Sequence, residues 1–314
     1  MTITQLEYII AVDNYRNFAE AARRCYITQP TLSMQIKKLE EELDVLVFDR
    51  SKKPVIPTEV GRAILEQARE GLKGLNRIYD LINDQQEGLT GELRVGIIPT
   101  LSPYLLPRFA AKFTSKYPRV ELIVEEMVSQ DIVKKLSSDL LDVGVLVTPL
   151  NAISIKEIPL FYEAFFVYMS NDYPLADQLE LNPSDLNIAD MWVLREGHCF
   201  RNQMVNICKR GDKKQCGRPL RFESGSMETL RRIVDRQYGF TLLPELAVLE
   251  LPPEQHGPVR PFAGQPPLRE VSLVTHRSFL KQKLIEAFRA EVIESIPSNL
   301  LDKSRGTVVK WQED

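Results

Sequence analysis

The sequence predicts an α + α/β protein, in which a small helical module is followed by one long helix and a larger α/β domain. Three observations lead to this prediction. Short amphipathic helical patterns fill the first 58 residues, and one longer pattern runs from residue 58 to residue 87. Beyond Gly88, short runs rich in β-branched residues alternate with helical stretches. That alternation is typical of α/β domains.

The N-terminal module has helical spacing of its apolar residues from the start. Leu6, Ile9 and Ile10 form one stripe, and Asn17 followed by Glu20 resembles a capping box that opens a second helix. A third helix is expected to begin near Thr28, because threonine is a residue type that caps helices. Residues 1–58 are therefore predicted to form three short helices and a following turn.

The third helix separates apolar and polar residues onto opposite sides. Its apolar residues are spaced by four, three and four positions, which places them on one face: Leu32, Ile36, Leu39 and Leu43. The leading end and the opposite face carry the remaining candidates: Thr28, Gln29, Pro30, Thr31, Ser33, Met34 and Lys37. Small polar side chains and an amide can reach base edges in a major groove, while a lysine binds phosphate. We interpret this segment as a recognition helix.

A basic turn after the third helix suits the wing of a winged helix-turn-helix. Arg50, Lys52 and Lys53 are its candidate phosphate contacts, with no acidic residue between Arg50 and Thr58. Because the whole chain has a net charge of −3, any DNA contact has to come from such local patches. The alternative is a small helical bundle whose polar face is accidental.

The helical pattern from residue 59 to residue 88 predicts a linker helix. At about 1.5 Å per residue it would be roughly 45 Å long, which is too long for a helix inside a small domain. Self-pairing of this helix would present two recognition helices to two half-sites of double-stranded promoter DNA. We therefore expect at least a dimer.

Residues 89–300 are expected to form an α/β domain with mostly parallel sheets. The expected strands are 93–98, 120–124, 143–147, 165–169, 191–194, 240–243 and 271–274, and the expected helices are 105–116, 132–140 and 227–236. The segment after about Pro297 is polar, and residues 301–314 are expected to form a loosely ordered tail.

Composition narrows the class of protein. Hydrophobic residues make up 44% and charged residues 26%, and no apolar run reaches the roughly 18 residues of a membrane span. We expect a soluble cytoplasmic protein with no membrane partner. Its four cysteines, Cys25, Cys199, Cys208 and Cys216, do not form a structural disulfide framework in that compartment, so each is judged separately.

The first 60 or so residues resemble the N-terminal signature of the LysR-type regulators. The resemblance rests on Phe18-Ala19-Glu20-Ala21-Ala22, Thr28-Gln29-Pro30-Thr31-Leu32-Ser33, Ile36-Lys37-Lys38-Leu39-Glu40, Leu46-Val47-Phe48-Asp49-Arg50 and Thr58-Glu59-Val60-Gly61. It implies a linker helix and an effector domain of two Rossmann-like lobes resembling a periplasmic binding protein. The implied lobes are about 89–161 with 269–300, and about 162–268, with crossover strands near 159–162 and 267–269. It also implies a homotetramer, with RNA polymerase as a further candidate partner.

Within that family, the effector domain resembles the members that sense hydrogen peroxide. The resemblance rests on 197–203 followed by Cys208, and on 98–101, 103–107, 227–231 and 239–244. Phe200, Asn202 and Ser129 depart from the usual leucine, aspartate and threonine. It implies that Cys199 reacts with peroxide, that Cys208 resolves the product as a disulfide, and that Thr100, Ser129, His198 and Arg269 line a peroxide pocket. It implies transcription activation, and neither an enzyme nor a cofactor.

Elementary chemistry adds two expectations about these cysteines. Peroxide oxidises thiolate, so Cys199 needs stabilisation of its anion, and the Gly197 turn suggests a helix N-terminus, with His198 and Arg201 as further donors. The nine positions from Cys199 to Cys208 span about 13.5 Å along a helix, whereas a disulfide tolerates about 7 Å between Cα atoms. Unless the intervening chain already loops back, a disulfide would therefore have to unwind the segment. Our hypothesis is that this change moves the dimer interface of the effector domains.

Other interpretations stay open at this point. Cys25 is assigned to packing, and Cys216 is either a bystander or an alternative resolving thiol. A zinc site of His198, Cys199, Cys208 and Cys216 lacks the close paired spacing of structural zinc sites, so no metal is expected. The alternative function is a LysR-type regulator that binds a small metabolite between the lobes. A thiol peroxidase-like enzyme or a free-standing solute-binding protein would have no need of the DNA-binding module.

Overall fold

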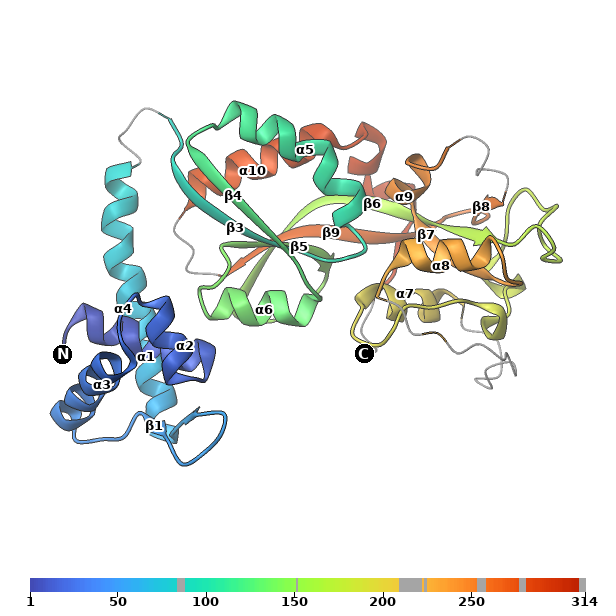
Figure 1. Cartoon of the computed structure of the whole chain (residues 1–314). Coiled ribbons are helices and arrows are strands. Elements are labelled where there is room, and N and C mark those ends of the chain that lie inside the picture. Colours follow the sequence, from blue (N-terminus) through green and yellow to red (C-terminus); the bar gives the residue numbers. More distant parts are fainter. Residues whose placement is uncertain are drawn as a thin grey trace. The chain divides into compact units, whose positions relative to one another are not determined.

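The computed structural model describes residues 1–83, 88–150, 152–208, 222, 225–252, 258–276 and 281–310. Contacts divide the chain into two compact units, Met1–Glu87 and Gly88–Asp314, and each is described by itself. Figure 1 traces the order of the elements. Within the described residues, every helix falls short of the length and apolar character needed to cross a bilayer.

The first unit is a winged helix-turn-helix. It consists of α1 (Ile3–Tyr15), α2 (Phe18–Arg24), α3 (Gln29–Leu43), β1 (Phe48–Asp49), β2 (Ile56–Pro57) and α4 (Glu59–Asn83). Its core gathers buried apolar residues of α1 to α4 together with two at the start of the wing: Ile9, Val12, Ala21, Ala22, Leu32, Ile36, Leu39, Leu65 and Ala68 from the helices, Val47 just before β1, and Phe48 in β1. The predicted stripe of α3 is thus buried except at its last member, because Leu43 at the C-terminal end of the helix is exposed.

Local caps set the ends of these helices. Asn17 is the N-cap of α2, as predicted, and accepts hydrogen bonds from the backbone N–H groups of Ala19 and Glu20. The expected second half of the capping box differs, because the Glu20 carboxylate pairs with Arg23 and Arg24. Thr28 is the N-cap of α3, but its hydroxyl pairs with Thr31 at 2.8 Å rather than capping the backbone. The basic turn joins β1 to β2, which pair antiparallel as a small wing.

The second unit is built on one curled sheet with the order β4-β3-β5-β9-β6-β7. Its strands are β3 (Gly91–Ile97), β4 (Val120–Glu126), β5 (Val143–Thr148), β6 (Ile155–Met169), β7 (Phe240–Pro244), β8 (Val259–Pro261), β9 (Pro267–His276) and β10 (Thr307–Val308). Its longer helices are α5 (Ser102–Lys116), α6 (Ser129–Ser137), α7 (Cys199–Ile207), α8 (Met227–Val234), α9 (Glu245–Leu249) and α10 (Gln282–Ser295). Short 3-10 turns cover 183–185, 188–190, 298–301 and 303–305.

Two long strands, β6 and β9, connect the two halves of this sheet (Figure 1). We call the half with β3, β4, β5, α5, α6 and α10 the first lobe, and the half with β7, β8, α7, α8 and α9 the second lobe. In the first lobe, α5 and α10 lie side by side, with the rings of Phe109 and Phe288 at 5.2 Å. The crossovers expected near 159–162 and 267–269 lie within β6 and β9.

Three expectations about this unit are wrong. The sheet is not mostly parallel: β3 pairs with β4 and β5, and β10 with β9, in parallel, whereas β9 and β6 pair antiparallel with each other and with β5, β7 and β8. The run 191–194 forms only an isolated bridge from Met191 to Phe240 rather than a regular strand. Helix α6 ends at Ser137, because Asp139 adopts a left-handed φ of 55°.

The expected loose tail is wrong as well, up to residue 310. Two 3-10 turns follow Pro297, Leu300 is fully buried, and β10 pairs with β9. The missing side chain of Gly306 makes the pairing possible, because a Cβ there would lie 2.1 Å from the carbonyl oxygen of Pro266. We call residues 298–310 the C-terminal segment.

Candidate functional site

Two helix N-termini from different lobes meet at Cys199. The turn at Gly197 has a φ of 94°, His198 is the N-cap, and Cys199 is the first residue of α7. Its thiol donates a hydrogen bond at 3.0 Å to the hydroxyl of Ser129, the first residue of α6. Both side chains are buried. The predicted helix N-terminus at Cys199 is confirmed, and a residue 70 positions away supplies the thiol's hydrogen-bond partner.

A small cavity adjoins the thiol. Its volume open to a water-sized molecule is about 10 Å³, which is about what one such molecule needs. The lining comes from the end of β3, the start of α6 and the start of α7: Ile98, Pro99, Thr100, Val128, Ser129, Gly197, His198, Cys199 and Phe200. The structure thus brings Thr100, Ser129 and His198 to one cavity beside Cys199.

Arg269, the fourth expected pocket residue, lies behind this cavity. It is fully buried, and its guanidinium donates to the hydroxyl of Thr100 at 3.0 Å and to the carbonyl oxygen of Thr100 at 3.1 Å. The other side of the guanidinium contacts the carboxylate of Glu163 at 2.7 Å, and its face lies 5.0 Å from the ring centroid of Phe200. Arg269 is therefore connected to the cavity by its hydrogen bonds to Thr100, which lines it.

Glu163 is a residue that the sequence analysis missed. The signal for it was a single acidic residue inside an otherwise apolar and aromatic run, 160–169. A buried carboxylate in such a strand requires a partner, but sequence alone does not say which basic residue supplies it. Burial raises the pKa of Glu163, against the opposing charge of Arg269.

The pKa values of Cys199 and Cys208, at the two ends of α7, are set by different groups. Burial raises the pKa of the Cys199 thiol, although the Ser129 hydrogen bond, the Cys199 backbone N–H and the charge of Arg269 all act to lower it. At the other end, burial alone raises the pKa of Cys208 to about 12. Both sulfurs are free thiols that are protonated at neutral pH in this conformation.

His198 and Arg201, the two further donors expected beside Cys199, lie in different surroundings. Burial lowers the pKa of His198, with a further contribution from Arg195, so the imidazole is neutral near pH 7. Among the described residues, its Nε2 is buried without a hydrogen-bond partner. Arg201 pairs with Glu196 at 3.6 Å, so its charge is directed to that carboxylate.

Cys208 lies at the far end of the same helix. It is the C-cap of α7, fully buried, and its backbone N–H donates to the carbonyl oxygen of Met204 at 3.2 Å. Because the chain is helical from Cys199 to Ile207, the two cysteines are about 13.5 Å apart along the axis, beyond the roughly 7 Å limit for a disulfide. Cys216 lies outside the described residues.

The C-terminal segment holds α7 from one side. The side-chain amide of Gln203 donates to the carbonyl oxygen of Val309 at 2.8 Å, and that of Asn206 donates to the carbonyl oxygen of Lys310 at 3.0 Å. Arg305 pairs with Glu245 at 2.7 Å and fixes the segment to the start of α9. These contacts tie the helix between the two cysteines to the end of the chain.

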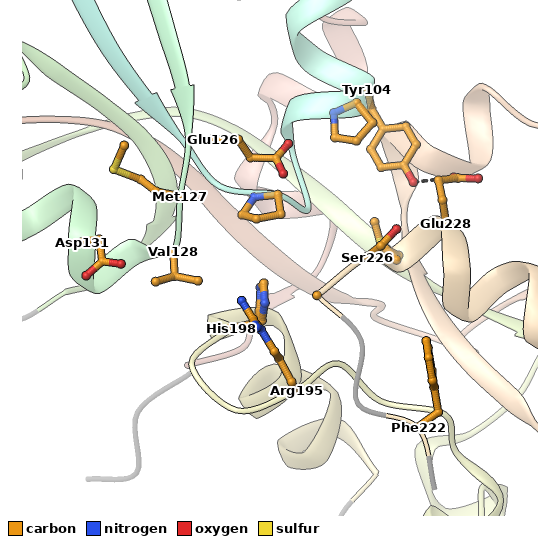
Figure 2. Close-up of a pocket in the computed structure, with 14 residues that line it drawn as sticks. Tyr104, Glu126, Met127, Val128, Asp131, Arg195, His198, Phe222, Ser226 and Glu228 are labelled. Atoms are coloured by element: carbon orange, nitrogen blue, oxygen red, sulfur yellow. Dashed lines mark hydrogen bonds between the residues drawn. The ribbon is translucent and has the colours of Figure 1, made fainter. Parts of the chain in front are cut away.

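A larger cleft, drawn in Figure 2, shares Pro99, Val128 and His198 with the lining of the small cavity. Its volume is about 700 Å³, and it is lined by Pro99, Pro103, Tyr104, Glu126, Met127, Val128, Asp131, Arg195, His198, Phe222, Gly225, Ser226, Met227 and Glu228. At one side of the cleft, the Tyr104 hydroxyl donates to the Glu228 carboxylate at 2.6 Å and joins α5 to α8. His198 lines both spaces, so it forms part of the wall between them.

The candidate DNA-contacting residues of the first unit lie at its surface. Ser33 is half-buried, and the other nine are exposed: Thr28, Gln29, Pro30, Thr31, Met34, Lys37, Arg50, Lys52 and Lys53. Arg50 is also a structural residue, because it pairs with the buried carboxylate of Glu40 at 2.7 Å and donates to Ser33 at 3.3 Å. Glu40 in turn accepts from the backbone N–H groups of Val47 and Phe48, which ties the wing to α3.

Within the described ranges, no three His, Cys, Asp or Glu side chains converge as a metal site requires. The zinc alternative also needed Cys216, which those ranges do not include.

Comparison with known proteins agrees with both units. Residues 3–62 match the model of the bacterial regulatory helix-turn-helix protein, lysR family, and residues 86–297 match the LysR substrate binding domain. The chain is 33% identical over 274 residues to a hydrogen peroxide-inducible genes activator of Haemophilus influenzae, covering 87% of this chain and 90% of that protein.

Solved structures give the same assignment. A full-length OxyR variant from Pseudomonas aeruginosa superimposes with a TM-score of 0.76 at 34% identity, covering 93% of this chain and 98% of that one. A hydrogen peroxide-bound OxyR mutant from Corynebacterium glutamicum gives a TM-score of 0.59 at 30% identity, covering 94% of both chains. By both family matches, the chain belongs to the LysR family of bacterial transcription regulators.

Proposed function

We propose that this protein is a transcription regulator that senses hydrogen peroxide by oxidation of Cys199 and formation of a Cys199–Cys208 disulfide. The observation that carries the proposal is the position of the Cys199 thiol beside a cavity that admits one water-sized molecule and has polar groups of Thr100, Ser129 and His198 in its wall. The relatives that are named for peroxide response, and the neighbour solved with hydrogen peroxide, support the same chemistry.

The proposed reaction is balanced with peroxide as the only oxidant. Cys199 loses its proton, its sulfur attacks one peroxide oxygen, the O–O bond breaks, and the leaving oxygen gains a proton and departs as water. Cys199 is then a sulfenic acid. The Cys208 sulfur attacks the Cys199 sulfur, the S–O bond breaks, and a second water leaves with formation of the disulfide.

In this proposal, residues 1–58 bind promoter DNA, 59–88 pair two copies, 89–300 sense peroxide with lobes divided near 161 and 268, and 301–314 form the C-terminal end. Disulfide formation unwinds α7, because its ends are too far apart to be joined as a helix. The rearrangement alters contacts between effector domains and hence the spacing of the recognition helices in a dimer or tetramer. The regulator acts in the cytoplasm as an activator that recruits RNA polymerase.

The test is thiol titration coupled to DNA footprinting in both redox states. One equivalent of peroxide should remove two thiols per chain, and peptide masses should locate a Cys199–Cys208 link while the footprint changes. Retention of all thiols at micromolar peroxide would contradict the proposal. A link from Cys199 to Cys216 would instead reassign the resolving cysteine.

A second candidate function is response to a small metabolite. The cleft of about 700 Å³ favours it, because that volume and its mix of apolar walls and convergent polar groups suit a small-molecule ligand. The same titration separates the two candidates: a metabolite regulator would change its footprint with ligand while all thiols stay reduced.

The DNA contacts predict different effects for two α3 residues. Ser33→Ala should relax sequence preference, because a hydroxyl that reads base edges is lost, whereas Lys37→Ala should weaken binding to all sequences and lower the salt slope by about 1. Binding isotherms for promoter and random DNA at several salt concentrations measure both. Lys38→Ala, a neighbouring exposed lysine, is the matched control. Equal effects of Ser33→Ala on promoter and random DNA would remove Ser33 from base readout.

A further inference from the structure

We infer that Glu163 is a positioning residue for peroxide reduction: it holds Arg269 so that the Thr100 hydroxyl donates its proton into the cavity beside Cys199. This inference rests on the proposed function, since it concerns how peroxide would be activated there. It assigns a role to a carboxylate that does not line the cavity itself.

The geometry begins with the two crossover strands. Glu163 in β6 and Arg269 in β9 are register partners, and both side chains are fully buried. One carboxylate oxygen of Glu163 accepts from Arg269 Nε at 2.8 Å and from Nη2 at 2.7 Å. The other oxygen accepts from the backbone N–H of Leu246 at 3.1 Å. The carboxylate is thus fixed by the start of α9 and in turn fixes the guanidinium.

The guanidinium in turn fixes the orientation of Thr100. Its Nη1 donates to the Thr100 hydroxyl oxygen and its Nη2 to the Thr100 carbonyl oxygen. An arginine has only donors, so the Thr100 oxygen must be the acceptor in this contact. The hydroxyl keeps one proton to donate elsewhere, and Thr100 lines the cavity. Arg269 therefore orients a neutral donor toward the place where peroxide would lie.

That donor matches the needs of the reaction. As the Cys199 sulfur attacks, negative charge develops on the departing peroxide oxygen until it gains a proton and leaves as water. A preorganised donor at that oxygen stabilises the transition state more than the ground state. Across the cavity, the Ser129 hydroxyl faces the sulfur itself. Thr100 would serve the leaving oxygen and Ser129 the attacking sulfur.

Stability alone is a weak reason for this arrangement. A buried ion pair contributes little compared with apolar side chains of similar volume, because both charges lose their hydration. What the pair does provide is a fixed orientation, because the Arg269 guanidinium donates four hydrogen bonds, two to one Glu163 carboxylate oxygen and two to Thr100. The pair thus supplies orientation at the site rather than net stability.

The test compares the second-order rate constant for sulfenic acid formation at Cys199 in the full chain carrying Cys208→Ser. Glu163→Gln should lower this constant roughly 10- to 100-fold, as expected when a reacting geometry is displaced. Alkylation of Cys199 by iodoacetamide at the same pH should be no slower, because that reaction does not use the Thr100 donor. Glu291→Gln, which removes another fully buried carboxylate paired with Lys116, is the matched control and should leave the peroxide rate unchanged.

A double-mutant cycle separates positioning from a general structural effect. In an Arg269→Met background, Glu163→Gln should add no further loss, since Glu163 acts through Arg269. An unchanged rate in Glu163→Gln, or additive losses in the cycle, would overturn the inference. If Glu163→Gln does not fold, Glu163→Asp is the second variant, because it keeps the charge but draws the guanidinium away from Thr100. A normal peroxide rate in Glu163→Asp would equally overturn the inference. Failure of the unsubstituted Cys199 to react with peroxide would instead refute the proposed function.

Discussion

Cys199→Ser should abolish the change in DNA footprint at every peroxide concentration that shifts the native protein, while DNA binding by the reduced form stays intact. A serine hydroxyl is too weak a nucleophile to open the O–O bond, and the isosteric change leaves the pairing with Ser129 available. The expected effect is complete loss rather than a shift in dose. Footprinting across a peroxide series measures it.

The partner substitution should give a different failure. With Cys208→Ser, Cys199 should still form a sulfenic acid, detectable by a dimedone adduct, but the disulfide should not form. In the described conformation burial raises the pKa of Cys208 to about 12, so this thiol is almost entirely protonated at pH 7. Cys208 therefore has to leave its buried position before it can attack.

Controls come from the remaining cysteines. Cys25 is half-buried at the C-cap of α2, and Cys25→Ser should respond normally. Cys216→Ser should do the same if Cys208 is the resolving thiol. A peroxide-dependent footprint in Cys199→Ser would show that another residue is the sensor.

Gly306→Val should shift the reduced form toward the disulfide at a fixed glutathione ratio. A side chain at residue 306 collides with the Pro266 carbonyl and displaces β10, and with it the acceptors of Gln203 and Asn206. Two hydrogen bonds at roughly 0.5–1.5 kcal/mol each stabilise the helical form, so their loss should shift the equilibrium about 5- to 150-fold toward the disulfide.

Thr307→Ala is the matched control, because it alters an exposed side chain of the same segment and keeps the backbone pairing. Gln203→Leu should reproduce much of the Gly306→Val effect from the helix side. An equilibrium within twofold of the native value in both variants would contradict the prediction that the C-terminal segment stabilises reduced α7. Mass spectrometry of alkylated protein measures the ratio of the two forms.

Local patterns predicted much of this structure. Apolar spacing identified α3 and its buried face, Asn17 identified the start of α2, and Gly197 identified a turn before a helix that begins at Cys199. Each of these features depends on residues within one or two helical turns of one another. Such short-range physics can be read directly from the order of residues.

Long-range pairing could not be predicted in the same way. Runs of β-branched residues indicate strands but not their direction, so the antiparallel pairing of the crossover strands β6 and β9 was missed. Glu163 meets Arg269 across 106 positions, through a register that includes an irregularity between Pro159 and Phe161. The anchoring of the C-terminal segment depends on Gly306 fitting against Pro266. The polar composition of this segment gives no sign of that contact. The cavity members Thr100 and Ser129 came from family resemblance, because neither has a local signal.

The hydrogen bond from Cys199 to Ser129 links the two lobes as well as placing the sulfur beside the cavity. It connects the first residue of a helix in one lobe with the first residue of a helix in the other. When the Cys199 sulfur forms a disulfide, it no longer carries a proton to donate, so this hydrogen bond between the lobes is lost. Spectroscopic labels on the exposed Lys134 of α6 and on Asn202 of α7 would therefore read oxidation as a change of distance, with no DNA present.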